Sequence, residues 1–172
     1  MIKNKGIFPF SEYLVDLADE LAQIRSKMSK NVYNDKTEKY RGEEEQRVSS
    51  LGVLGELIAR EHFKSIIEPT TNYKFTPIIE FNLLPEPDLY IKGMRVDIKT
   101  IPEDKNIFMV NEPAYKNPDK KVNWYWYVKL KGNYNCEHWL VESSDVSEWE
   151  LKKFRYTNAY WCEIPKEYDR VI

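Results

Sequence analysis

The stretch of sequence that decides the fold is residues 87–99, which read Pro-Asp-Leu-Tyr-Ile-Lys-Gly-Met-Arg-Val-Asp-Ile-Lys. Lys92 and Gly93 have the form of a two-residue hairpin turn, because glycine accepts the positive φ that such turns require. A hairpin centred on this turn places Asp88 directly opposite Asp97. The Cβ atoms of residues that face each other in this way lie about 5 Å apart. The segment therefore predicts two carboxylates side by side on neighbouring strands.

Side chains alternate along a strand, so this hairpin is expected to have one apolar and one polar face. The apolar face would hold Leu89, Ile91, Met94, Val96 and Ile98, and the polar face Asp88, Tyr90, Arg95, Asp97 and Lys99. Two facing carboxylates repel each other unless a divalent cation lies between them. A nearby ammonium can orient or help to deprotonate a water, or stabilise a pentavalent phosphate. The pattern indicates metal-assisted phosphodiester hydrolysis, although a plain surface pair of Asp97 and Lys99 fits the hairpin equally well.

Two helices are expected before this hairpin. Apolar residues recur at three- and four-residue steps within residues 11–30, which predicts an amphipathic helix. A second helix is expected from Glu43 to about Phe63, and it carries Gly52 and Gly55. Each helical glycine costs about 1 kcal/mol relative to alanine. Close packing of this helix against a sheet would compensate for that cost.

The remainder of the chain has the character of strands. Runs rich in β-branched and aromatic residues predict strands at Phe75–Phe81, Asp88–Ile91, Met94–Ile101, Asn106–Val110, Trp124–Leu130, His138–Val141 and Tyr156–Ile164. A short helix is expected at Val146–Phe154. Helices followed by consecutive strands favour the α+β class or a mixed α/β sheet flanked by helices, in a single domain of residues 1–172.

Composition excludes several classes of protein. With 172 residues, 42% of them hydrophobic and 31% charged, the chain is neither disordered nor collagen-like. The net charge of −2 is not that of a strongly basic nucleic-acid-binding domain. Residues 91–131 are nevertheless locally positive, with 9 basic and 5 acidic side chains. Two cysteines and two histidines without zinc spacing argue against a structural zinc site.

No apolar run in the sequence is long enough for a secretory leader or a membrane span. We therefore expect a cytoplasmic protein with reduced thiols and no membrane association. The histidines, His62 and His138, have no nucleophile beside them in the sequence and are assigned to structure. The aromatic run 124–127 is assigned to a core strand rather than to a base-stacking platform.

The ordered acidic residues resemble the PD-(D/E)XK nuclease superfamily, the restriction-endonuclease-like proteins. Pro87-Asp88 matches the PD element, and Asp97-Ile98-Lys99 matches the (D/E)XK element. The family also places an acidic residue on the helix before these strands, and Glu56 in the segment 52–59 matches it. The resemblance spans about residues 50–130. It implies a central mixed sheet flanked by helices with a core at about 43–142, to which the helix 11–30 and residues 143–172 are additions.

The resemblance also implies roles for individual residues. Asp88 and Asp97 would be metal ligands together with the carbonyl of Ile98, and Lys99 would be the catalytic lysine. Glu56 would assist the metal or a water, with Glu61 as the alternative helix acid. The implied cofactor is Mg²⁺, for which Mn²⁺ can substitute, and the implied activity is that of an endonuclease.

DNA is the partner that this interpretation favours, and many members of the family act on it as homodimers. The residues expected to contact its backbone are Arg95, Lys116, Lys120 and Lys121. A cross-strand cation–π pair with Tyr90 is the alternative for Arg95, and a solvated basic loop is the alternative for the three lysines. Two other functions stay open from the sequence. The same site would serve an RNA-directed or exonucleolytic enzyme, and a nuclease-like scaffold without activity would serve as a nucleic-acid or protein binding module.

Overall fold

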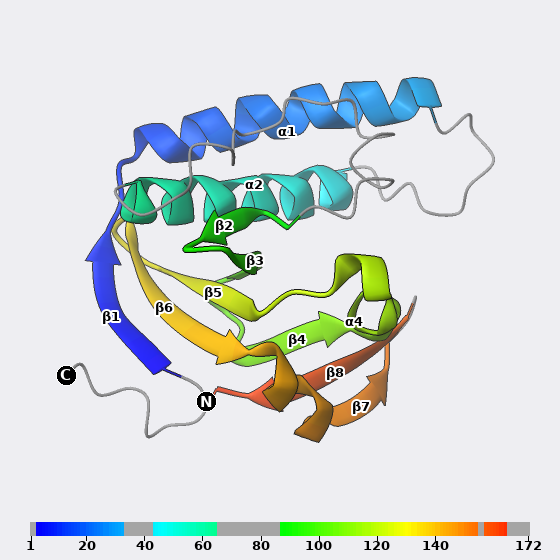
Figure 1. Ribbon diagram of the computed structural model, residues 1–172. Helices are drawn as coiled ribbons and strands as arrows, with labels where there is room; N and C mark the ends of the chain where they lie inside the picture. The colour runs from blue at the N-terminus through cyan, green and yellow to red at the C-terminus, as the bar shows by residue number, and fades with distance from the viewer. Residues whose placement is uncertain (1–2, 33–42, 65–86, 155–156, 165–172) are drawn as a thin grey trace.

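Two helices, a five-stranded sheet and a three-stranded sheet form successive layers of the fold (Figure 1). The structure is a computed structural model, and it describes residues 3–32, 43–64, 87–154 and 157–164. Helices α1 (Tyr13–Val32) and α2 (Glu43–Phe63) pack side by side, and α2 lies directly on one face of the larger sheet at β3 and β5. The chain therefore has a mixed α+β architecture, as the order of its elements predicts.

The larger sheet has the strand order β1-β6-β5-β3-β2. Its strands are β1 (Lys3–Pro9), β6 (Asn135–Glu142), β5 (Trp124–Lys131), β3 (Met94–Ile101) and β2 (Leu89–Ile91). β3 and β5 are parallel, and the other neighbouring pairs are antiparallel. The sheet is therefore mixed, as expected. Strand β1 was not predicted, because its sequence is short of apolar residues and is interrupted by Gly6, which has a φ of 90°.

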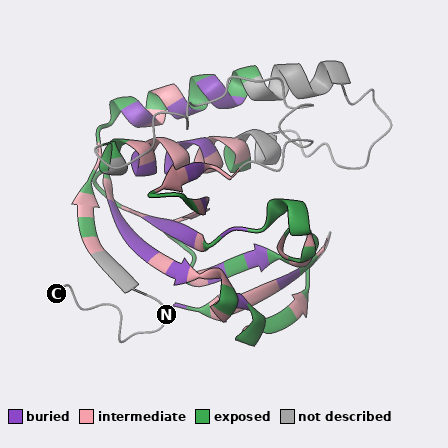
Figure 2. Cartoon of the chain, viewed as in Figure 1, coloured by how far each residue is buried: buried purple, intermediate pink, exposed green. Residues whose placement is uncertain are grey.

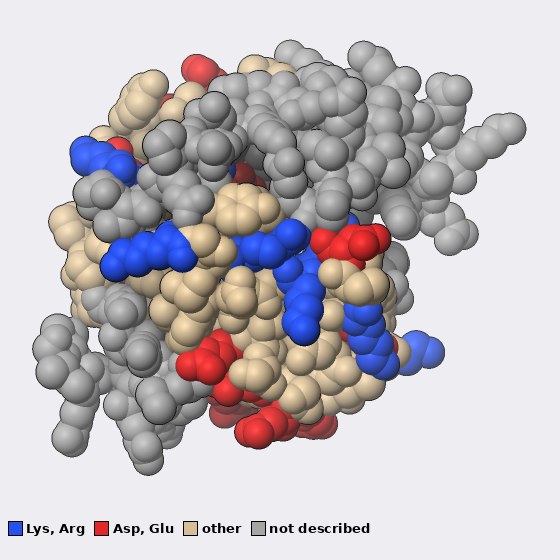
Figure 3. Space-filling view, viewed as in Figure 1, with Lys and Arg blue, Asp and Glu red and all other residues tan. Residues whose placement is uncertain are grey.

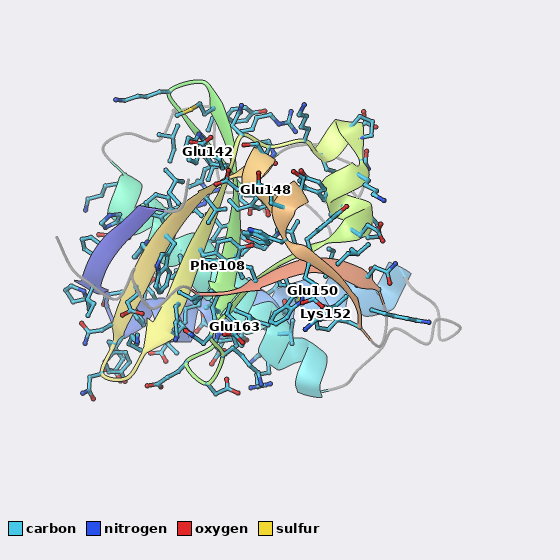
Figure 4. The ribbon with its side chains drawn as sticks, turned by 90° about the horizontal axis from the view of Figure 1, so that it is seen from below. Phe108, Glu142, Glu148, Glu150, Lys152 and Glu163 are labelled. Atoms are coloured by element: carbon cyan, nitrogen blue, oxygen red, sulfur yellow. The ribbon has the colours of Figure 1, made fainter. Side chains whose placement is uncertain are left out.

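The smaller sheet is antiparallel, with the order β4 (Ile107–Asn111), β8 (Asn158–Glu163) and β7 (Glu150–Lys153). The connection from β3 to β5 contains β4, the short helix α4 (Glu112–Lys116) and the 3₁₀ turn η1 (Pro118–Lys120). Seen from below, β7 and β8 cross the molecule with Glu150, Lys152 and Glu163 on them (Figure 4). A small sheet, rather than helices, covers the second face of the larger sheet.

The prediction of a helix at Val146–Phe154 is wrong. The chain forms a 3₁₀ helix, η2 (Ser143–Glu148), and then extends into β7. Trp149 has an extended backbone with φ −77° and ψ 156°, and its ring stacks on Phe108 at a centroid distance of 6.0 Å. Pairing of β7 with β8 thus outweighs the weak helical pattern. The strand expected at Phe75–Phe81 lies outside the described residues.

The hairpin of β2 and β3 has the predicted turn and register. Leu89 pairs with Val96, and Tyr90 pairs with Arg95. Lys92 and Gly93 form the turn with φ values of 51° and 75°, the left-handed conformation of a two-residue hairpin loop. Leu89, Val96 and Ile98 are buried and face the helices. Asp97 and Lys99 therefore project from the opposite face of the sheet.

Two apolar cores separate the three layers. The first joins α1 and α2 to the larger sheet through Leu14, Ala18, Val53, Ile58, Trp126 and other buried residues. The second lies between the two sheets and includes Ile101, Phe108, Val110, Tyr127 and Trp139. Strands β5 and β6 contribute to both cores and are mostly buried (Figure 2). The aromatic run 124–127 belongs to these cores, with Tyr125, Trp126 and Tyr127 at most 5% exposed.

Helix α2 approaches β3 closely at one glycine. A Cβ atom added to Gly55 would overlap Thr100 Oγ1 and lie 3.0 Å from Thr100 Cβ. Gly52, one turn earlier, has no atom within 4 Å of the same position. Only Gly55 is therefore required by packing, and it sets the distance between the helix and the strand.

Substituting the two glycines separates packing from helix propensity. Gly55→Ala should destabilise the fold by about 1–3 kcal/mol through overpacking against Thr100. Gly52→Ala should stabilise it by up to about 1 kcal/mol, because alanine favours the helix and meets no neighbour. Urea unfolding measures both. A Gly55→Ala variant as stable as the wild type would contradict the close approach, and adding Thr100→Ala should recover part of the loss.

A neutral histidine is buried under the helices. Trp126 Nε1 donates a hydrogen bond to His138 Nδ1 at 2.6 Å, so the ring proton lies on Nε2, 3.1 Å from Cys136 Sγ. His62 packs on this ring at a centroid distance of 4.9 Å. Burial, followed by the charge of His62, lowers the pKa of His138 from 6.5 to about 3. Both histidines thus belong to the packing of the fold, as expected.

The low pKa of His138 makes the stability of the fold dependent on pH. In the unfolded chain this histidine takes up a proton below pH 6.5, whereas in the folded chain it resists protonation down to about pH 3. The stability that neutral His138 contributes to the fold is complete above pH 6.5. Between pH 6.5 and about pH 3 it is lost on acidification, at up to about 1.4 kcal/mol per pH unit. Denaturation at several pH values measures how the free energy of unfolding changes with pH. Between about pH 3 and 6.5 this slope should be smaller in His138→Asn, by the amount that the uptake of one proton on unfolding contributes. An unchanged slope would show that His138 is not buried in neutral form.

Candidate active site

Asp88 is held at the start of the hairpin by the neighbouring strand. It directly precedes β2, and its carboxylate Oδ2 accepts a hydrogen bond of 2.6 Å from the backbone N–H of Ile98. Ile98 lies between Asp97 and Lys99 in β3. This bond fixes the carboxylate of Asp88 against the middle of the D-x-K segment.

Asp97 and Lys99 form an ion pair on the sheet face that points away from the helices. Their side chains are 27% and 36% exposed, so solvent and a ligand can reach them. Farther along the same face of β3, Ile101 is only 3% exposed and belongs to the second core. The polar pair thus lies at the rim where the smaller sheet ceases to cover β3.

The environment of Asp88 disfavours its negative charge. Burial raises the pKa of this carboxyl well above its usual value, and the charges of Asp97 and Glu56 raise it further. Lys99 and the N–H of Ile98 act in the opposite direction but do not cancel these effects. Charged side chains from α2 and β3, namely Glu56, Asp97 and Lys99, therefore act electrostatically on Asp88.

Lys99 is held as a cation by the same carboxylates. Burial by itself would lower the pKa of its ammonium, but Asp97 and Asp88 outweigh that effect and raise the pKa above its ordinary value. The lysine and the acids thus stabilise one another as a charged cluster.

Glu56, rather than Glu61, is the helix acid that lies near Asp88. Glu56 is half-buried, and its charge acts on Asp88. The Glu61 side chain is 61% exposed and forms an ion pair of 3.1 Å with Lys64. Five residues along a helix correspond to a rotation of about 500°, so the two acids face different sides.

Two tyrosines of β5 line the same face beside the acids. The parallel register pairs Asp97 with Tyr125 and Lys99 with Tyr127. Burial and then the charge of Asp97 raise the pKa of Tyr125 to about 12. The hydroxyl of Tyr127 donates to the carbonyl of Met109 at 3.1 Å. The sequence indicated only their burial, because the parallel pairing of β3 with β5 was needed to place them next to the acids.

Arg60 is a further residue of the site that the sequence pattern did not reveal. Its Nη2 donates a hydrogen bond of 2.8 Å to the backbone carbonyl of Asp88. The available signal was its spacing, because residues four apart share one face of a helix and Arg60 follows Glu56 by four.

The predicted DNA-contacting residues are not equivalent. Lys116 Nζ lies 2.6 Å from Glu112, whose pKa is lowered by the bonds from Lys116 and Asn158. Lys120 and Lys121 are exposed, and no ion pair of theirs is present within the described part of the chain. Arg95 donates to the carbonyl of Asp119 at 3.3 Å, which ties the hairpin to η1.

Basic and acidic side chains gather in different parts of the surface. Basic side chains form a row across the face that carries the β2–β3 hairpin and α4 (Figure 3). The view from below shows Glu142 at the end of β6, Glu148 on η2, and Glu150 and Glu163 on the smaller sheet, where Lys152 pairs with Glu150 (Figure 4). The basic row is therefore the part of this surface that attracts a polyanion.

Neither known protein-family models nor curated protein sequences contain a match to this chain. No described helix is both long and apolar enough to cross a membrane. The functional interpretation depends on the geometry of the site.

The donor chemistry of the site fits a hard divalent cation. Within the ranges that the structure describes, no three His, Cys, Asp or Glu side chains are already arranged as a metal-binding group. Mg²⁺, however, is commonly held by one or two carboxylates, with water and phosphate oxygens completing its shell. Asp88 and Asp97 supply such carboxylates, and the negative charges of Asp97 and Glu56 act on Asp88.

Neutralising Asp88 should stabilise the metal-free protein. Asp88→Asn removes a buried, repelled charge and keeps an oxygen that can accept from the N–H of Ile98, so the melting temperature should rise. Asp97→Asn is the matched control, because it removes the ion pair with Lys99 and should give no such increase. Thermal unfolding in EDTA measures both. A lower melting temperature for Asp88→Asn than for Asp97→Asn would contradict the crowding of charge at Asp88.

Proposed function

We propose that this protein is a metal-dependent nuclease that hydrolyses phosphodiester bonds in DNA as an endonuclease, with a restriction-endonuclease-like arrangement of its sheet. The observation that carries the proposal is the convergence of Asp88 and Asp97 beside Lys99, with the helix acid Glu56 acting on the same carboxyl. Neighbouring carboxylates that raise one another's pKa are typical of sites that bind a cation or perform acid–base chemistry. The resemblance to the PD-(D/E)XK pattern assigns the same four residues.

In this proposal Mg²⁺, or Mn²⁺ in its place, would be held by Asp88, Asp97 and the carbonyl of Ile98. When bound, the ion would neutralise charge on the scissile phosphate. Lys99 holds the attacking water by hydrogen bonding and stabilises the negative charge that develops on the phosphate oxygens. Glu56 orients a water at the edge of the site. The Ile98 N–H keeps the carboxylate of Asp88 in place.

Substitution of the acids and the lysine tests the activity. Asp97→Ala and Lys99→Ala should each reduce cleavage of plasmid DNA in Mg²⁺ at least about 100-fold, because a preorganised charged group is removed. Glu56→Gln should reduce cleavage, whereas Glu61→Gln, at the exposed ion pair with Lys64, should leave it unchanged. Gel assays with Mg²⁺, Mn²⁺ or EDTA measure the effects. Full activity of purified Asp97→Ala would refute the proposed site.

The charge pattern supports DNA as the partner. The basic row lies on the side of the molecule that carries the hairpin and α4, and Glu148, Glu150 and Glu163 are seen in the view from below (Figures 3 and 4). Lys120 and Lys121 follow one another at the exposed end of η1. Arg95 anchors η1 to the hairpin that holds the acids. A DNA backbone bound along η1 would thus lie next to the proposed catalytic residues.

The lysines give a matched comparison of DNA affinity. Lys120→Ala combined with Lys121→Ala should weaken binding and flatten its dependence on salt, by about 0.9 in log–log slope for each phosphate that the protein no longer neutralises. Lys116→Ala should change binding less, since Glu112 already neutralises this lysine. Fluorescence anisotropy at several salt concentrations, in EDTA, measures both. If removal of Lys116 weakened DNA binding as much as removal of Lys120 or Lys121, the proposed path of the DNA backbone along η1 would be contradicted.

One observation favours the alternative function, a nuclease-like scaffold that binds nucleic acid or protein without cutting. Lys99 is already paired with Asp97, which occupies the ammonium that cleavage would need. Such a scaffold would bind DNA equally well with and without Mg²⁺ and would cut none of the supercoiled, linear or branched substrates. A nuclease would bind the divalent ion through Asp97 and would no longer bind it in Asp97→Ala.

A further inference from the structure

Arg60 connects helix α2 to the main chain of Asp88. The guanidinium Nη2 donates to the carbonyl of Asp88 at 2.8 Å, in a partly buried position. The carboxylate of the same residue accepts from the N–H of Ile98 at 2.6 Å. Asp88 is thus held at two points, its main chain by the helix and its side chain by β3.

The β2–β3 ladder does not include Asp88. Pairing of the two strands begins with Leu89 and Val96. The carbonyl of Asp88 therefore takes its hydrogen bond from Arg60, outside the strand register. Arg60 thus fixes the main chain of Asp88 at a point that the β2–β3 pairing does not reach.

The anchor is rigid because α2 is fixed to the sheet. Ile58 and Ala59, the two residues before Arg60, are 3% and 0% exposed. The close approach of Gly55 to Thr100 fixes the same helix against β3. Arg60 follows Glu56 by four residues, so the helix turn that carries the acid also carries the anchor.

We propose that Arg60 is a positioning residue for metal-dependent cleavage: its guanidinium fixes the main chain of Asp88 so that the carboxylate stays beside Asp97. This role rests on the proposed nuclease function. It differs from the roles of the four acidic and basic residues, because Arg60 acts through Asp88 and not on the phosphate. Outer partners that orient metal ligands typically contribute 10–100-fold to metal affinity.

The test compares Arg60→Met and Arg60→Lys with Arg47→Met, an exposed arginine on the same helix. Calorimetric titration of each full-length protein with Mn²⁺ alone measures the affinity of the site for the metal, independently of cleavage. We expect Arg60→Met to lower Mn²⁺ affinity about 10–100-fold. Arg60→Lys should recover part of the affinity through its remaining donor, and Arg47→Met should match the wild type. Cleavage by Arg60→Met should be largely restored at saturating Mn²⁺, whereas removal of Lys99 is not compensated by metal.

A second readout needs no metal. Hydrogen exchange of the Ile98 amide, which donates to Asp88, should accelerate in Arg60→Lys and Arg60→Met but not in Arg47→Met. Unaltered Mn²⁺ affinity and unaltered Ile98 exchange in Arg60→Met would overturn the role of Arg60 alone. A wild type that binds no Mn²⁺, or that binds it equally well as Asp97→Ala, would overturn the proposed function itself.

Discussion

The placement of Asp88 beside other charged side chains is the constraint on which the proposed site depends. Asp88 is partly buried, and both this burial and the charges of Asp97 and Glu56 disfavour its negative charge. The β2–β3 hairpin, with its left-handed turn at Lys92 and Gly93, brings Asp88 next to β3, where its carboxylate accepts from the N–H of Ile98, and α2 supplies Glu56. Charge crowding of this kind persists only where the surrounding fold determines it, and a bound cation would turn the repulsion into attraction.

The layers of the fold explain why the site is both rigid and accessible. One face of β3 is covered by α2, and the close contact of Gly55 with Thr100 leaves no room for adjustment. The other face is covered by the smaller sheet only as far as Ile101. Asp97 and Lys99 lie just beyond that cover, beside the buried Tyr125 and Tyr127 of β5. A reactive pair at the rim of a packed core is held in place while a substrate can still reach it.

The hairpin and both long helices could be predicted from the sequence because their signals are local. A Lys-Gly turn between alternating strands defines a register, and apolar residues at helical spacing define α1 and most of α2. Strand β1 and the replacement of the helix at Val146–Phe154 by η2 and β7 depend on pairing with distant strands, which no local pattern encodes. The neighbours Tyr125 and Arg60 were missed for the same reason. One required the parallel pairing of β3 with β5, and the other required contact between α2 and the start of β2.

The most direct test of the central claim is the position of a bound metal ion. Crystals of the protein grown with Mn²⁺ would give an anomalous difference map that locates the ion independently of any activity assay. The account predicts one strong peak coordinated by the carboxylates of Asp88 and Asp97 and by the carbonyl of Ile98, and no such peak in Asp97→Ala. An ordered hairpin without a peak at saturating Mn²⁺, or with a peak elsewhere only, would contradict it.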